Sequence, residues 1–173
     1  TVCESWTSRG SLETLGDFED GLARVAEMDR DASKGDNAFR KALAKWWEKI
    51  GDDLTWTGRD FDGTSWGELT VPGVWEDRQI GAFDGVVFMR KVIQLPESWA
   101  GQELSLELGP VDDMDTTWFN GQRVGGMERP GSWNVPRRYV VPANLVKAGA
   151  NVIAVRCVDT SGAGGFAGAP DSM

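Results

Sequence analysis

Histidine is absent from the chain, which has 173 residues. Imidazole is the general base of Ser-His-Asp and Cys-His systems and the commonest zinc ligand, so those nucleophilic mechanisms are excluded within this chain. Only two cysteines occur, Cys3 and Cys157, which are too few for a disulfide scaffold and are not spaced like thiolate metal ligands. Their positions do not decide whether they pair. The sequence therefore predicts no catalytic residue of these classes, no metal and no cofactor.

Positive charge is also scarce. The chain carries 18 Lys and Arg residues against 27 Asp and Glu residues, which gives a net charge of −9. This is the wrong sign for binding nucleic acid phosphates or anionic lipid, so neither is predicted as a partner. No run approaches about 18 apolar residues, and TVCESWTSRG lacks the basic start and apolar stretch of a signal peptide. Because the chain starts at Thr1 and stops after a glycine-rich run, we expect it to be part of a longer protein.

The hydrophobic period changes near Gly51. Before it, apolar residues recur three or four positions apart over 12–28 and 39–50, which is the period of amphipathic helices. A turn at 33–35 separates the two stretches. The sequence therefore predicts an N-terminal α-helical hairpin within residues 1–51, which we expect to act as a connector.

After Gly51 the period is two. Leucines alternate with polar residues over 102–109, and a similar alternation spans 151–158. Asn120-Gly121 between two short apolar stretches indicates a tight hairpin. Further strands are predicted at 86–95 and 137–141. Short strands separated by turn residues favour a mainly β fold, an antiparallel sandwich or jelly roll over 52–160, followed by a glycine-rich loop or tail over 161–173.

Four segments of this region resemble a known domain: FDGVVFMRKVIQLP (83–96), LELGPVDDMDTTWFNGQRVG (106–125), WNVPRRYVVP (133–142) and AGANVIAVRCVDTSGAGG (148–165). Together they are similar to the jelly-roll domain, of galactose-binding-domain-like type, in glycoside hydrolase family 2 enzymes. More narrowly, they resemble the version inserted into sialate O-acetylesterases, which are SGNH-type carbohydrate esterases. The N-terminal part, including Trp46-Trp47, is similar to the connector beside the esterase core.

The resemblance implies that the chain is a noncatalytic accessory domain. In such esterases the catalytic Ser, acidic and His blocks lie outside this segment, and the missing histidine agrees with that. The implied partner is the catalytic SGNH core of the parent, whose sugar-ester site the domain would shape. Such esterases are commonly exported, so the resemblance implies a periplasmic or secreted parent, although the sequence itself leaves the compartment open. The alternative is an autonomous carbohydrate-binding module.

Four residues are candidates for sugar contact. Trp118 and Trp133 neighbour loop residues and polar groups, and an exposed indole ring offers a rigid apolar platform to a saccharide. The alternative for both is packing in the core. Arg137 and Arg138 carry planar guanidinium groups that could bind the carboxylate of an acidic sugar. Their alternative is pairing with aspartates of the same domain.

Acidic residues are densest at Asp112-Asp113-Met114-Asp115, directly before a predicted strand. Asp112 and Asp115 are the candidates here. The cluster could fix a turn through backbone N–H groups, face a sugar or a neighbouring domain, or support carboxylate-based glycosidase or calcium chemistry. A small hydrolase built on these carboxylates is a third hypothesis. By alternation Cys157 points to the apolar face, so we expect a buried and unreactive thiol.

Overall fold

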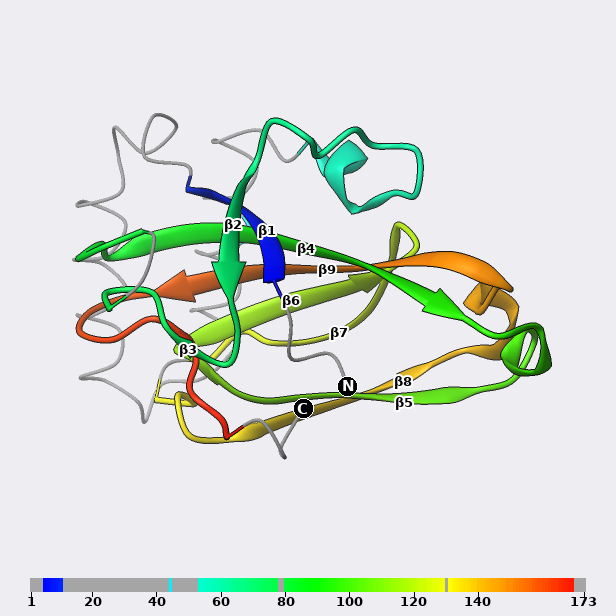
Figure 1. Ribbon diagram of the computed structural model, residues 1–173. Coiled ribbons are helices and arrows are strands. Elements are labelled where there is room, and N and C mark those ends of the chain that lie inside the picture. The colour runs from blue at the N-terminus through cyan, green and yellow to red at the C-terminus, as the bar shows by residue number, and fades with distance from the viewer. Residues whose placement is uncertain (1–4, 11–43, 45–52, 78–79, 130, 170–173) are drawn as a thin grey trace.

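The computed structural model describes residues 5–10, 44, 53–77, 80–129 and 131–169. In this part of the chain two antiparallel sheets face each other (Figure 1). The strands are β1 (Ser5–Gly10), β2 (Gly67–Thr70), β3 (Gly73–Val74), β4 (Gly85–Leu95), β5 (Leu104–Asp112), β6 (Met114–Phe119), β7 (Gln122–Met127), β8 (Pro136–Val141), β9 (Gly149–Asp159) and β10 (Gly165–Phe166). The 3-10 turns are η3 (Leu54–Thr57), η4 (Glu97–Trp99) and η5 (Ala143–Leu145).

The six-stranded sheet has the order β2-β1-β4-β9-β6-β7, and the four-stranded sheet has the order β3-β10-β5-β8. The predicted antiparallel sandwich is confirmed, and the strands predicted after residue 85 lie where the alternation placed them. Apart from Ala44, which is helical, the predicted N-terminal helical hairpin lies outside the described residues, as do Cys3, Trp46 and Trp47. Among the described residues, no helix has the length and apolar character needed to span a bilayer.

The β6–β7 hairpin turns at Asn120-Gly121, as predicted. Both residues have positive φ, 49° and 85°, which is the conformation that favours Asn-Gly in two-residue hairpins. The Asn120 side chain also has a tertiary role, because its amide donates to Leu145 O at 2.9 Å and to Asn151 Oδ1 at 2.8 Å. Its Oδ1 accepts from Val152 N at 2.8 Å. This side chain therefore holds the hairpin against η5 and the central strand β9.

The main core lies between the two sheets. It is formed by alternate residues of facing strands, so the period of two in the sequence becomes one apolar face on each sheet. Its buried members are Leu69, Val71, Trp75, Val87, Met89, Leu106, Leu108, Val111, Phe119, Val141, Val146, Ile153, Val155, Cys157 and Phe166. The buried Cys157 thiol is thus confirmed. Burial raises the pKa of this thiol, which keeps it protonated and unreactive at neutral pH.

A second, aromatic core covers the outer face of the six-stranded sheet. Trp56 of η3 contacts the rings of Trp66, Phe88 and Trp118, with centroid separations of 6.0, 5.1 and 5.5 Å. Arg90 of β4 holds this segment down, because its side chain donates to Trp56 O at 3.2 Å and to Gly58 O at 3.0 Å. The loop from η3 to β2 is therefore an integral layer of the domain.

Two predicted boundaries were wrong. β1 lies inside the six-stranded sheet between β2 and β4, so the sandwich includes residues before 51. β10 pairs with β3 and β5, and Phe166 is fully buried, so the glycine-rich stretch is not a loose tail. The physical reason is close packing, because a Cβ at Gly164 would overlap the Trp75 ring. The glycines here permit the contact between backbone and indole.

Gly125 of β7 allows an equally close approach by Tyr139, which generates a prediction. A Cβ at Gly125 would overlap the Tyr139 ring, whose hydroxyl is fixed by hydrogen bonds to Asp115. We expect Gly125→Ala to lower the free energy of unfolding by about 1–3 kcal/mol through overpacking. At Gly63 the nearest atoms lie 3.8 Å or farther from the added Cβ, so Gly63→Ala is the matched control and should change little. Chemical denaturation of both variants checks this, and equal effects would contradict it.

Candidate functional site

Two of the predicted site residues form a buried ion pair between the sheets. Asp115 of β6 and Arg137 of β8 both have fully buried side chains, and Nε of Arg137 lies 2.8 Å from Oδ1 of Asp115. The carboxylate also accepts from Thr117 Oγ1 at 2.8 Å and Met127 N at 3.3 Å. Of the alternatives for Arg137, the structure therefore shows pairing inside the domain.

The Arg137 guanidinium has every donor occupied. Besides Asp115 it donates to four backbone carbonyls, those of Val111 (2.7 Å), Asp113 (2.9 Å), Ser132 (2.7 Å) and Val135. These carbonyls belong to the end of β5, to the start of β6 and to the loop before β8. A full set of partners is what a buried charge requires. The group is thus committed to holding the fold, and none of its donors remains for a ligand.

Tyr139 completes this network on the carboxylate side. Its hydroxyl lies 3.0 and 2.9 Å from the two oxygens of Asp115. Burial and then the Asp115 charge raise the pKa of Tyr139, so the phenol stays protonated and donates. Sequence reasoning gave this residue no role in the site. The only signal for such a role was its position two residues after Arg137, which puts both side chains on the same face of β8.

Trp118 lies in the aromatic core on the outer face and is 4% exposed. Its ring meets Trp56 at 71°, and the Arg156 guanidinium carbon lies 5.4 Å from its centroid. The structure therefore places this indole in the packing role, with a cation–π contact on it.

Trp133 and Arg138 lie at the surface. Trp133, in the loop before β8, is 52% exposed. Arg138 points outward from β8 and pairs with Glu107 at 3.0 Å, again an ion pair within the domain. The structure does not bring these two together with Trp118 and Arg137 into one site. A carbohydrate-binding role for Trp133 and Arg138 stays a prediction.

Four carboxyl groups gather at one end of the sandwich, where β5 and β9 end and β6 begins. They belong to Glu76, Asp112, Asp113 and Asp159. Asp113 accepts from Thr160 N at 2.9 Å and from its hydroxyl at 2.5 Å, and Glu76 accepts from Gly164 N. Asp159 is 0% exposed; its Oδ1 accepts from Ser161 N at 3.1 Å. Oδ2 of Asp159 has no hydrogen-bond partner among the described residues.

This crowding raises two pKa values. Burial, followed by the charge of Asp113, a hydrogen bond that the protonated Asp112 donates to it and the charge of Glu76, raises the pKa of Asp112 to about 7, although Arg137 opposes the shift. Burial, followed by the charges of Asp113, Asp84 and Glu76, raises the pKa of Asp159 to about 7. Across the described ranges, no group of three or more Cys, Asp or Glu residues has the geometry to hold a metal. The raised pKa values mean that Asp112 and Asp159 hold a proton more tightly than ordinary aspartates.

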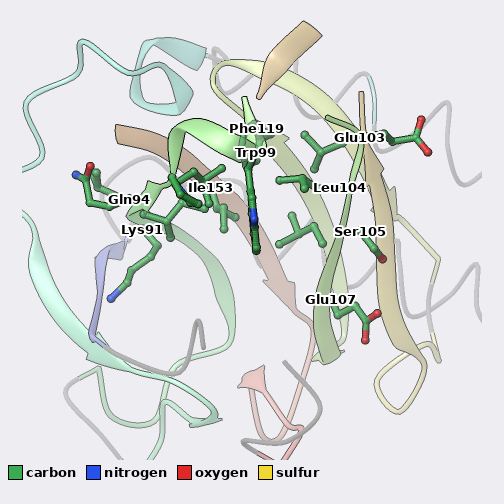
Figure 2. A pocket seen from close by; sticks show the side chains of 15 residues that line it. Lys91, Gln94, Trp99, Glu103, Leu104, Ser105, Glu107, Phe119 and Ile153 are labelled. Atoms are coloured by element: carbon green, nitrogen blue, oxygen red, sulfur yellow. The ribbon is translucent and has the colours of Figure 1, made fainter. Parts of the chain in front are cut away.

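An open cleft lies at the opposite end of the sandwich, between the two sheets (Figure 2). Its volume is about 870 Å³. One wall is the second half of β4, the other is the first half of β5, and the floor is formed by core side chains such as Phe119, Val141 and Ile153. This volume lies in the range of about 300–1,000 Å³ that is typical of ligand sites.

Trp99 stands between the two walls of this cleft. In Figure 2 Lys91 and Gln94 lie on one side of its ring, and Ser105 and Glu107 lie on the other. The side chain is 47% exposed. Sequence reasoning did not single out Trp99. The signal in the sequence was its place in the turn Pro-Glu-Ser-Trp-Ala-Gly between two strands. A large ring in such a turn belongs to neither sheet.

Comparison with known proteins identifies the fold. No family model matches the chain. A β-glucuronidase from an uncultured Clostridium species is similar to it with a TM-score of 0.55 and 14% identity over 90% of this chain and 21% of that chain. A β-glucuronidase from Ruminococcus gnavus gives 0.54 and 16% over 90% and 20%. A glycosyl hydrolase family 2 member from Bacteroides cellulosilyticus gives 0.54 and 17% over 67% and 18%.

The sandwich thus has the fold of a domain found in glycoside hydrolase family 2 proteins, as the broader resemblance implied. At these identities the likeness establishes the fold alone. The chain spans about a fifth of the length of these neighbours. The narrower prediction of an esterase insert stays a prediction.

The buried ion pair of Asp115 and Arg137 generates a prediction on stability. Arg137→Met removes the ion-pair partner of the buried Asp115 carboxylate and the donor to four backbone carbonyls, so we expect a loss of about 3–5 kcal/mol in the free energy of unfolding. Arg138→Met removes an exposed ion pair and should cost less than about 1 kcal/mol. Urea unfolding measures both. Equal losses would show that the buried network is not a main support of the fold.

The carboxyl cluster yields a prediction on pH. The pKa of Asp159 is about 7 in the folded state, against about 3.9 for an ordinary aspartate, so between these values the folded state keeps a proton that the unfolded state has released. Its contribution to stability is therefore complete below about pH 4 and is lost as the pH rises through about 7.

Asp159→Asn keeps the acceptor for Ser161 N and cannot ionise. We expect the variant to equal the wild type near pH 4 and to exceed it at pH 8 by roughly 2–4 kcal/mol. The exposed Asp60→Asn is the control and should leave the pH profile unchanged. Unfolding titrations from pH 4 to pH 8 give the comparison. A wild type that is more stable than Asp159→Asn at pH 8 would contradict the prediction.

Proposed function

We propose that this chain is a noncatalytic accessory domain of a larger carbohydrate-active hydrolase, where the sandwich packs beside the catalytic part and shapes access to the sugar substrate. The observation that carries the proposal is that the polar side chains of Asp115, Arg137 and Tyr139 are engaged in bonds within the domain. The side chains of Asp115 and Arg137 are fully buried, Tyr139 is half-buried, and both Arg137 and Tyr139 bond to Asp115 within the domain. The structural neighbours, of whose chains the matched region covers only about a fifth, support a domain that serves a larger enzyme.

Within this proposal, the parent is a sialate O-acetylesterase of the SGNH type, and the domain's partner is its catalytic core. The four sequence segments that resemble the esterase insert support this choice. The alternative parent is a glycosidase, which the structural neighbours favour, since they are a β-glucuronidase and a glycosyl hydrolase family 2 member. A hydrolase built on Asp112 and Asp115 within the chain is disfavoured, because Asp115 is saturated by donors and buried.

We expect the isolated chain to hydrolyse neither p-nitrophenyl acetate nor p-nitrophenyl β-D-glucuronide above a heat-denatured control. The physical reason is the absence of imidazole together with the commitment of Asp115 to Arg137. Circular dichroism confirms that the assayed chain is folded. Turnover that disappears in Asp112→Asn would overturn the noncatalytic assignment.

An activity assay of the proposed longer protein distinguishes an esterase parent from a glycosidase parent. It should cleave the acetyl ester of an O-acetylated sialic acid and leave the glucuronide intact. Cleavage of the glucuronide alone would replace the esterase parent with a glycosidase while preserving the accessory role of the domain.

A further inference from the structure

We infer that the cleft between β4 and β5 is a binding site for a neutral saccharide, with Trp99 as its stacking platform. The inference rests on the proposed function, since it names the class of ligand that the accessory domain would hold. It differs from the sequence-based site, whose aromatic candidates were Trp118, which lies buried in the outer core, and Trp133, which lies outside the cleft.

The cleft exists because strand pairing stops short on both of its walls. β1 pairs with β4 only over Val87–Arg90, and β10 pairs with β5 only over Val111–Asp112. Among the described strands, the stretches Val92–Leu95 and Leu104–Glu107 therefore have a partner on one side only, which is β9 for the former and β8 for the latter. Strand edges of this kind present backbone N–H and C=O groups that can bond a polar ligand.

The chemistry of the lining matches a sugar ring. The half-exposed indole of Trp99 and the apolar floor suit the C–H face of a pyranose, because flat rings pack closely and lose little entropy. Gln94, Ser105 and Glu103 line the rims and offer both donors and acceptors for hydroxyl groups. A site with a few polar groups around an apolar base is typical of small-molecule pockets.

The charges favour a neutral ligand. Lys91 on one wall is offset by Glu103 and Glu107 on the other, so the lining has no excess of positive charge for a phosphate or carboxylate. Glu107 is already paired with Arg138. An anionic sugar would therefore find less attraction here than an uncharged one.

The position of Trp99 also argues against an added polypeptide strand. Open strand edges can accept an extended peptide, but a strand along β4 would meet the indole that stands between the walls (Figure 2). A sugar stacks on the same ring without displacing it. The cleft is thus shaped for a compact ring-bearing ligand.

The test is calorimetric titration of the full chain with cellotriose, xylotriose and lactose, and separately with N-acetylneuraminic acid, D-glucuronic acid and a Thr-Val repeat hexapeptide. We expect binding of at least one neutral saccharide, weakened about tenfold or more by Trp99→Ala and largely restored by Trp99→Phe. Leu54→Ala is the matched control, since this large apolar side chain is similarly exposed but lies outside the cleft lining, and it should leave the affinity unchanged.

Each other outcome overturns the inference. If no neutral saccharide gives binding heat at 10 mM, the cleft is not a saccharide site, because this concentration is on the order of the weakest dissociation constant expected of a site. Binding confined to the acidic sugars or to the peptide assigns the cleft to another ligand class. Equal losses in Trp99→Ala and Leu54→Ala show that binding does not use the cleft. None of these results bears on hydrolysis, so the accessory role stands or fails on its own assay.

Discussion

The sandwich depends on one buried guanidinium. Arg137 enters from the four-stranded sheet, pairs with Asp115 of the six-stranded sheet, and bonds four carbonyls around itself. A charge buried in this way is costly unless every donor has a partner, and here every donor does. The consequence is that the end of β5, the start of β6 and the loop before β8 are fixed by a single side chain. Tyr139 and the close approach at Gly125 then follow from where that pair must sit.

Sequence reasoning captured the parts of this fold that depend on local pattern. The alternation around Leu106 and Leu108 gave the inward face of β5, and Asn120-Gly121 gave the hairpin, because both are determined by a few neighbouring residues. What it missed depends on distant partners. Phe166 looked like part of a glycine-rich tail, because nothing local shows that Trp75 needs the space beside Gly164.

The candidate site shows the same division more strongly. Arg137 and Asp115 were chosen for their chemistry, and internal pairing was the alternative that the structure shows. Exposure decides which aromatic side chain can meet a ligand, and exposure is a tertiary property. Trp118 is covered by Trp56, which is 62 positions away in the sequence. Trp99, by contrast, is kept at the surface by a short turn between strands, which the sequence contains but does not mark as functional.

The two ends of the β5–β8 ladder explain how support and binding can coexist in one small domain. At one end Gly109 pairs with Arg137, and the polar network there is closed and satisfied. At the other end Leu104 pairs with Val141, where the core comes to the surface between open strand edges. A ligand at this second end would contact side chains whose positions are set by the core, while the bonds of Arg137 stay untouched. A ligand bound at the cleft therefore need not weaken the interaction on which the fold depends.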